Sequence, residues 1–300
     1  MNAENQTTFA LIPITFIGSV LNFSILIAIY KLPALNNSFG YLTANQAIVD
    51  ALHSVIFLLY FCPMVILDQP IMKSYSFIVG CFLLFCYELS VLTHFLISIN
   101  RFCAVWVPLK YEKWFSRKNT SSIIILLWIF EVALAIVFYQ ILCHVAYLEE
   151  IHFIQFTNTK FCGFVAWYDD FVKNSVIIAI VVCVDISTVL RVHHVTKKVR
   201  GDNKFTLRDL RFLRQSVFQG TVFLLELVTY FFIPQYFHNQ WIIFLGTSFM
   251  WVSIHAIDGM IVVMCNPEVR NFLMGRKNVY QITGPQNTTV PERTREMSNI

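Results

Sequence analysis

Several acidic side chains stand inside long apolar stretches of this 300-residue sequence. They are Asp50, Glu88, Glu131, Asp185, Glu226 and Asp258. A carboxyl group in such surroundings must be protonated, hydrogen-bonded or ion-paired, because a bare carboxylate there is too costly. No lysine lies at a comparable depth in these stretches, so the sequence offers the acids no obvious basic partner.

Arg101 stands where the third apolar stretch ends, in the segment ISINRFCAVWVPLKY. Charges in or at the edge of a membrane are costly, and they usually serve a function. The alternative is an arginine that reaches lipid phosphate and anchors the helix end. Lys110 and Lys113 lie close by and are equally available as anchors, which favours a functional role for Arg101.

The elements that position these residues are membrane helices. Only 13% of the residues are charged and 57% are hydrophobic, whereas soluble domains carry about 25% charged residues. Seven apolar runs reach the roughly 20 residues that a helix needs to cross a bilayer. They are 9–30, 41–67, 77–107, 122–144, 171–195, 213–237 and 241–265. The fold class expected is an all-α membrane protein, a bundle of seven transmembrane helices.

The basic residues orient the bundle. With the N-terminus outside, 19 of the 22 Lys and Arg residues fall on the cytoplasmic side. The other three are Lys73, Lys160 and Lys173. This split follows the positive-inside rule. It also places Asn5, in an Asn-Gln-Thr triplet, outside as a glycosylation acceptor, although an unmodified chance match is the alternative.

These assignments divide the chain into an extracellular N-terminus (1–8), a seven-transmembrane domain (9–275) and a polar, disordered cytoplasmic tail (276–300). No cleavage motif follows the first run, so it is expected to remain as a span and not to be removed as a signal peptide. The basic segment 192–214 is expected to contact a G protein or anionic membrane lipids. No cysteine spacing suggests zinc and no nucleophile–base motif suggests an enzyme. No cofactor and no nucleic-acid partner are expected.

Landmarks in register along the chain resemble those of rhodopsin-like G-protein-coupled receptors. They are Asn22, the segment Asn45–Asp50, Asn100-Arg101-Phe102, Trp128, Asp258-Gly259, Asn266 and Arg270. Four longer segments resemble the nematode serpentine chemoreceptors of class X (Srx): FGYLTANQAIVDAL, YELSVLTHFLISINRFCAVW, FLRQSVFQGTVFLLELVTYFF and WVSIHAIDGMIVVMCNPEVR. The similarity runs from about Gly18 to Phe272. It also implies a short amphipathic helix along the membrane after the seventh span.

The resemblance implies a G-protein coupling site at the cytoplasmic end of the third helix. Its residues are Asn100, Arg101, Phe102, Pro108 and Leu109. In the wider class an acid precedes the arginine and pairs with it, but here the position holds Asn100. The sixth helix, which often supplies a second acid, holds Arg214. The sequence therefore has an acid at neither position, and both ionic restraints are expected to be absent. Pro234 is expected to act as a hinge in the sixth helix, because proline removes a backbone hydrogen bond.

The resemblance also implies that Asp50 and Asp258 face each other and that Ser90 joins them. Two carboxylates and a hydroxyl suit a small hard cation such as sodium, because such ions prefer oxygen ligands. A protonated, water-bridged cluster without metal is the alternative. His255 stands three residues before Asp258 on the same helix face and is expected to be a hydrogen-bond partner, not a ligand.

Cys143 and Cys162 flank the second outer loop, in an oxidising compartment. A disulfide between them is expected, and the class X resemblance agrees with it. The alternative joins Cys81 to Cys162, as in most rhodopsin-like receptors. Cys86, Cys103 and Cys183 fall within the apolar runs and are expected to pack as small apolar residues.

Together these features predict a G-protein-coupled chemosensory receptor in the plasma membrane of a sensory cell. Its partners would be a heterotrimeric G protein, membrane lipids and a small molecule or odorant bound between the outer helix halves. The sequence does not identify that ligand, because the outer halves are aromatic and have no obvious charged anchor. The alternative function is a seven-helix ligand-gated channel or transporter.

Overall fold

The protein is described here from a computed structural model, in which residues 3–151, 153–198 and 203–276 are described. Seven helical segments within this part of the chain are long and apolar enough to cross a membrane. They are Asn5–Lys31, Ser38–Ile66, Ser76–Trp106, Arg117–Leu142, Lys160–His194, Arg214–Tyr236 and Gln240–Cys265. The predicted number of spans is confirmed. Residues 277–300 of the predicted tail lie outside the described residues.

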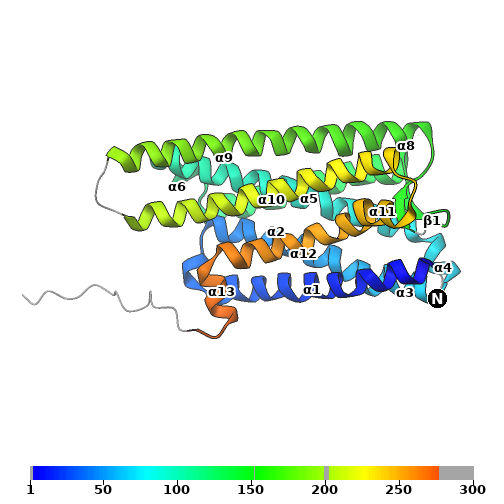
Figure 1. Cartoon of the computed structure of the whole chain (residues 1–300). Helices are drawn as coiled ribbons and strands as arrows, with labels where there is room; N and C mark the ends of the chain where they lie inside the picture. Colours follow the sequence, from blue (N-terminus) through cyan, green and yellow to red (C-terminus); the bar gives the residue numbers. More distant parts are fainter. Residues whose placement is uncertain (1–2, 152, 199–202, 277–300) are drawn as a thin grey trace, which may run out of the picture.

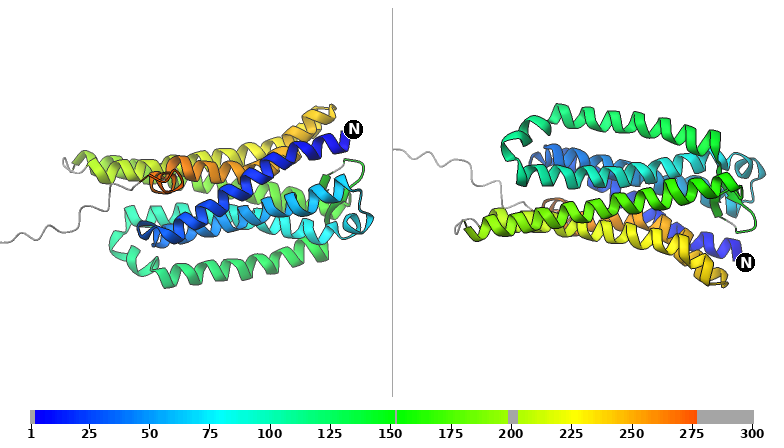
Figure 2. Two further views of the ribbon diagram at one scale, coloured as in Figure 1. Left: turned by 90° about the horizontal axis from the view of Figure 1, so that it is seen from below. Right: turned by 90° about the horizontal axis from the view of Figure 1, so that it is seen from above.

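Each span is built from one or more consecutive helical elements (Figures 1 and 2). The first four spans comprise α1 (Ala3–Lys31), α2 (Ser38–Ile56) with α3 (Cys62–Ile66), α5 (Ser76–Trp106), and α7 (Arg117–Ile136). The last three comprise α8 (Lys160–Val165) with α9 (Lys173–Lys198), α10 (Asn203–Tyr236), and α11 (Gln240–Phe244) with α12 (Met250–Cys265). Single π-helical turns at Phe57–Phe61, Val137–Leu142, Ala166–Val172 and Leu245–Phe249 extend or join these elements.

Shorter elements connect the spans. They are a 3-10 turn at Pro33–Leu35, α4 (Pro70–Ser74), α6 (Pro108–Trp114) and α13 (Pro267–Leu273). Side-chain caps fix several helix starts: Asn37 accepts from the Gly40 amide and Ser116 from the Asn119 amide. Such caps satisfy amide groups that have no partner within the helix. The helix predicted after the seventh span is present as α13; its orientation along a membrane stays a prediction.

A two-stranded antiparallel hairpin, which the sequence did not predict, lies between the fourth and fifth spans. It comprises β1 (Val145–Leu148) and β2 (Phe153–Phe156), with Val145 opposite Phe156. The Ser76 hydroxyl accepts a hydrogen bond of 2.9 Å from the Tyr147 amide and so ties β1 to the start of α5. The end of the bundle that carries β1, α4, α8 and the start of α1 is called the hairpin end here (Figure 1). The opposite end, with α6 and α13, is called the Arg101 end.

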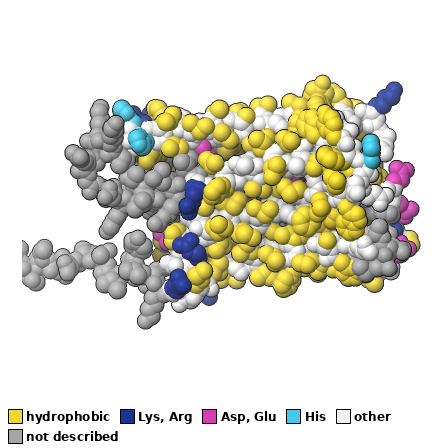
Figure 3. Space-filling model, in the orientation of Figure 1, with side chains coloured by type: hydrophobic (Ala, Val, Ile, Leu, Met, Phe, Trp, Pro, Cys, Tyr) yellow, Lys and Arg dark blue, Asp and Glu magenta, His cyan; other side chains and the backbone are white. Residues whose placement is uncertain are grey.

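The core is centred on the third span. Of its most apolar stretch, 72% is buried within the bundle, against 11% for the fourth span, which therefore lies at the periphery. Hydrophobic side chains cover the sides of the bundle, while Lys and Arg gather near the Arg101 end and Asp and Glu at the hairpin end (Figure 3). An apolar flank with hydrogen-bonded helices is the arrangement that a bilayer requires.

Two helix boundaries differ notably from the sequence prediction. The fifth span begins at Lys160 and not at 171, because Asp169 and Asp170, which looked like loop residues, find polar partners inside the bundle. The first helix begins at Ala3, so most of the predicted N-terminal segment 1–8 is helical. Asn5 lies in this helix and is partly exposed. Its glycosylation stays a prediction.

Candidate functional site

Four polar residues predicted as one cluster lie together at the centre of the bundle. The Ser90 hydroxyl of α5 donates to Oδ1 of Asp50 in α2 at 2.9 Å, and Nδ1 of His255 in α12 lies 2.7 Å from the same oxygen. The Asp258 carboxyl, one turn beyond His255, interacts with that of Asp50. All four residues are buried. By strict geometry, both oxygens of Asp258 and Oδ2 of Asp50 lack a hydrogen-bond donor among the described residues, although Gln219 of α10 also interacts with the Asp258 carboxyl.

The carboxyl oxygens of Asp50 and Asp258 that lack a donor are suitable ligands for a small hard cation such as sodium, because such ions prefer oxygen ligands. His255 is a competitor for Oδ1 of Asp50, as its ring nitrogen already contacts that atom. Within the described chain, no group of three or more His, Cys, Asp or Glu side chains is arranged to hold a metal ion. The sodium site therefore stays a prediction, with the hydrogen-bonded cluster as its alternative.

The structure adds His53 to this cluster, which the sequence interpretation missed. The rings of His53 and His255 have their centroids 3.8 Å apart, and Trp251 packs against His53 edge-on at 5.3 Å. The sequence did indicate that His53 belongs to this cluster, because His53 follows Asp50 by three positions and residues at that spacing share a helix face. On the same side of α12, Asn22 donates to the His255 carbonyl oxygen at 3.0 Å. A Cβ atom at Gly259 would stand 2.7 Å from Oδ1 of Asn22, so this approach needs glycine.

A second polar cluster lies closer to the hairpin end. The ammonium of Lys173 stands 2.9 Å from Oε2 of Glu88 in α5 and 3.2 Å from Oδ1 of Asp169. The Tyr139 hydroxyl donates to Asp169 at 2.6 Å, and the Asn174 amide donates to Glu88 at 3.0 Å. The prediction that no lysine lies at the depth of the acids is therefore wrong. Lys173 was counted on the outer side because it stands third in the predicted run 171–195, whereas the span begins at Lys160.

Two further acids extend this cluster across the bundle. The Tyr87 hydroxyl donates to Oε2 of Glu226 in α10 at 3.0 Å. The Asn174 amide donates to Oδ1 of Asp170 at 3.2 Å. Both acids are buried. The sequence interpretation saw no obvious charged group in the outer helix halves, whereas Glu88, Asp170 and Glu226 are buried in this region.

A cavity of about 300 Å³ opens at the hairpin end, above these acids. Its lining comes from the start of α1, the hairpin segment, the end of α10, and the α11 region; it includes Thr7, Phe153, Tyr230, Trp241 and Phe244. A smaller chamber of about 10 Å³ lies among Tyr87, Asp170, Glu226, Tyr230 and Trp251. That is room for about one water molecule. Tyr230 lines both spaces.

Pro234 also lines the larger cavity, two residues before α10 ends at Tyr236. A bend at this proline separates only the last turn from the rest of the helix, since its ring opposes the carbonyl of Tyr230. Its role as a hinge stays a prediction.

Arg101 lies at the opposite end of α5 and is 9% exposed. Its guanidinium stands over the Phe39 ring, 5.2 Å from the centroid. It also interacts electrostatically with Asp185 of α9, whose Oδ1 accepts from Ser98 at 2.8 Å. An acid is therefore available to Arg101 from the fifth span. The two acids whose absence the sequence indicated, before Arg101 and in the sixth helix, are distinct from this residue of the fifth span.

Asn100 makes its contacts away from Arg101. Its amide donates to the Ser38 hydroxyl at 3.1 Å and to the Tyr111 hydroxyl at 3.3 Å. These bonds tie α5 to the start of α2 and to α6. Phe102 stacks on Trp106 at 5.6 Å. The other two residues of the predicted coupling site begin α6: Pro108 is its first residue, and Leu109 is 98% exposed.

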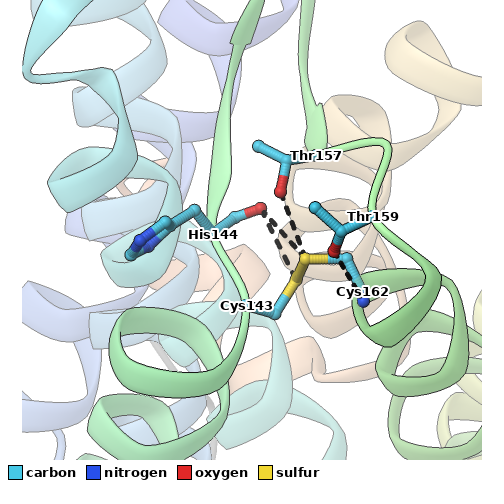
Figure 4. The surroundings of a disulfide bond; sticks show 5 residues. All are labelled: Cys143, His144, Thr157, Thr159 and Cys162. Atoms are coloured by element: carbon cyan, nitrogen blue, oxygen red, sulfur yellow. Dashed lines mark hydrogen bonds between the residues drawn. A yellow bond between two sulfur atoms is a disulfide. The ribbon is translucent and has the colours of Figure 1, made fainter.

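Cys143 and Cys162 form a disulfide with a Sγ–Sγ distance of 1.97 Å (Figure 4). It joins the residue before the hairpin to α8. The Thr159 hydroxyl accepts from the Cys162 amide at 3.1 Å and caps α8, and the Thr157 hydroxyl lies 3.1 Å from Sγ of Cys162 (Figure 4). Cys81 lies elsewhere, where its thiol donates to the Ala135 carbonyl oxygen at 3.6 Å. The alternative bridge from Cys81 is therefore not the one in this structure.

Trp128 of α7, one of the landmark residues, donates from Nε1 to Oδ1 of Asn45 at 2.7 Å. The Asn45 amide in turn donates to the Thr93 hydroxyl at 2.8 Å. The chain of contacts links the second, third and fourth spans. Trp128, Asn45 and Thr93 are thus joined by consecutive hydrogen bonds.

Most of the chain is similar in sequence to known proteins. The profile of the family described as "Serpentine type 7TM GPCR chemoreceptor Srx" matches residues 12–266. Serpentine receptor class X 45 of Caenorhabditis elegans is 27% identical over 285 residues, covering 86% of this chain and 78% of the relative. Serpentine receptor class X-43 of the same organism is 25% identical over 277 residues, covering 87% and 84%. Melanopsin-B of Xenopus laevis is 35% identical over 119 residues, covering 38% of this chain and 22% of its own length.

Proposed function

Because the chain belongs to the serpentine class X (Srx) family of seven-transmembrane G-protein-coupled chemoreceptors, we propose that it binds a small environmental molecule and activates a heterotrimeric G protein. It is a multi-pass membrane protein with seven spans and is not an enzyme. The proposed site of action is the plasma membrane of a sensory cell, with the hairpin end outside.

The observation that carries this proposal is the placement of two features at opposite ends of one bundle. The 300 Å³ cavity opens at the hairpin end. The Asn100-Arg101-Phe102 segment lies at the other end of α5. A receptor needs this separation, because ligand and G protein act from opposite sides of the membrane and communicate through a shift between two conformations.

Heterologous expression with a panel of chemicals and a second-messenger readout tests the proposal. A ligand response that disappears when G proteins are removed supports the receptor. A ligand-gated current that survives their removal supports a channel or transporter instead. Arg101→Ala should weaken the response while surface expression stays intact, and Lys110→Ala, an exposed control nearby, should leave it unchanged.

The proposed orientation has its own test. An epitope at the N-terminus should bind antibody on intact cells. Glycosidase treatment should shift the gel mobility of the wild type but not of Asn5→Gln. Antibody binding only after permeabilisation would reverse the orientation.

A further inference from the structure

Two carboxyl groups beneath the cavity have no basic partner. Glu226 of α10 and Asp170 in the turn before α9 both line the smaller chamber, and they are 2% and 6% exposed. Each accepts one side-chain hydrogen bond, from Tyr87 and from Asn174 respectively. Among the described residues, these are the side-chain hydrogen bonds that the two carboxyl groups accept, one to Oε2 of Glu226 and one to Oδ1 of Asp170. Such groups are expensive to bury unless a partner arrives.

Lys173 does not supply that partner. Its ammonium is engaged with Glu88 and Asp169, at 2.9 and 3.2 Å. No ion pair joins it to Glu226 or Asp170 among the described side chains. Lys173 therefore acts on Asp170 only through space, and the lining of the chamber holds the two acids and no basic side chain.

The remaining walls of the chamber suit a cation. Tyr87, Tyr230 and Trp251 line it together with the two acids. Aromatic faces attract ammonium groups, most strongly where water is excluded. The volume of about 10 Å³ admits a group of about the size of one water molecule, which an ammonium group matches.

The larger cavity shares Tyr230 with this chamber and is itself aromatic. Phe153 comes from the hairpin, and Trp241 and Phe244 come from α11. Glu150 stands at its lining, and acidic side chains gather on the surface of this end (Figure 3). A negative surface around a cavity mouth raises the local concentration of cations.

We propose that the ligand is an aromatic amine whose protonated amino group binds between Glu226 and Asp170 while its ring occupies the larger cavity. The inference rests on the proposed function, in which this cavity is the ligand site. An ammonium group has three donors and no acceptor, so it can donate to both carboxyl groups at once. A carboxylic acid of the same size would bring a like charge against two carboxyl groups and is disfavoured.

Thermal unfolding of the purified receptor in detergent, without G protein, tests the ligand class by itself. The probes are 2-phenylethylamine and tryptamine, each beside the alcohol and the carboxylic acid of the same carbon skeleton. Binding to the folded state raises the unfolding midpoint by mass action. The amines should raise it at roughly 1 mM, an accessible range for weak small-molecule affinities, and the alcohols and acids should not.

Two charge-removing variants locate the amino group. Glu226→Gln keeps an acceptor for Tyr87, and Asp170→Asn keeps one for Asn174, so either should fold. Each should lower amine affinity by about tenfold or more, since a buried charge partner is lost. Glu131→Gln is the matched control: it removes a buried carboxyl from α7 that lines neither space, and amine affinity should stay unchanged. If one variant fails to fold, the other carries the test.

Equal stabilisation by the alcohols or acids would overturn the proposal. So would unchanged amine affinity in the folded variants, or no stabilisation by either amine at about 10 mM, which is beyond the weakest affinity expected of a specific site. An amine that stabilises the receptor but activates no G protein would contradict the proposed coupling and leave the ligand class standing.

Discussion

The side-chain amide of Asn266 donates a hydrogen bond of 3.0 Å to Oε1 of Gln215 and so joins the turn between α12 and α13 to α10. Both residues are buried. Gln215 also donates to Gln219 one turn further along α10, at 3.4 Å. This contact holds the Arg101 end of α10 against the seventh span without any charged group. The sequence interpretation looked there for an acid and found Arg214, which is exposed.

Replacing Gln215 with alanine should therefore raise basal G-protein activation. One hydrogen bond contributes on the order of 1 kcal/mol, which corresponds to about fivefold in a two-state equilibrium. The assay measures basal activation at matched surface expression. Gln235→Ala, which removes an exposed glutamine from the other end of α10, is the control. Basal activity equal to the wild type in Gln215→Ala would show that the contact does not hold the resting state.

Asn100→Asp should lower basal activity, through Ser38 and Tyr111 and not through an ion pair with Arg101. An aspartate would accept hydrogen bonds from the two hydroxyls that Asn100 already contacts. Charge-assisted bonds of this kind contribute about 1.5–3 kcal/mol. Tyr111→Phe in the same background should cancel most of the effect. If the double variant has the same low basal activity as Asn100→Asp alone, the carboxylate acts on Arg101 and not through Tyr111.

Cys143→Ser or Cys162→Ser should reduce surface expression, whereas Cys81→Ser should matter less. The bridge closes a loop with a sequence separation of 19, and closing a loop of this length stabilises the fold by about 3 kcal/mol in the chain-entropy model. Surface labelling measures the loss. Mass-spectrometric mapping of the non-reduced protein that links Cys81 to Cys162 would contradict this pairing.

Sodium should raise the thermal unfolding midpoint relative to choline if Asp50, Ser90 and Asp258 hold the ion, because a ligand of the folded state stabilises it. Asp50→Asn should remove this dependence. Asp185→Asn, a buried acid at the Arg101 end, should keep it. If sodium does not change the unfolding midpoint of the wild type, the site holds no sodium ion and is the hydrogen-bonded cluster with His255.

Lys173→Met should lower the unfolding midpoint strongly, because it leaves Glu88 buried with its ion-pair partner removed. Breaking one side of a buried pair costs about 3–5 kcal/mol. The double variant Lys173→Met with Glu88→Gln should regain much of the loss. Lys160→Met, an exposed lysine at the start of the same span, is the control. A double variant no more stable than the single one would mean that Lys173 serves Asp169 and not Glu88.

The number of spans was predictable because the length of an apolar run is a local property of the chain. Arg101 was found because it stands at the end of an apolar run, whereas Trp128 and the Asp50–Asp258 group were found through the resemblance to rhodopsin-like receptors. The start of the fifth span was not found, since Asp169 and Asp170 are loop-like residues unless a partner buries them. Their spacing did contain a helical signal, as Asp169 and Lys173 are four positions apart and so share a helix face.

The polar contacts between helices were the part of the structure that was hardest to predict from the sequence. Lys173 meets Glu88, and Gln215 meets Asn266, across sequence distances of 85 and 51 residues. No periodicity in a single sequence relates such positions. The hairpin was missed for a different reason: its strands have only four residues each, too few for an alternating pattern to stand out.

The continuity of α10 has a thermodynamic consequence. One unbroken helix carries Glu226 and Tyr230 at the ligand chamber and Gln215 at the opposite contact. Under the proposed function, α10 would couple events at its two ends, and such coupling is reciprocal. If an amine raises the affinity for a G protein by some factor, the bound G protein must raise the affinity for the amine by the same factor. The apparent affinity of the receptor for its ligand would therefore depend on the amount of G protein present.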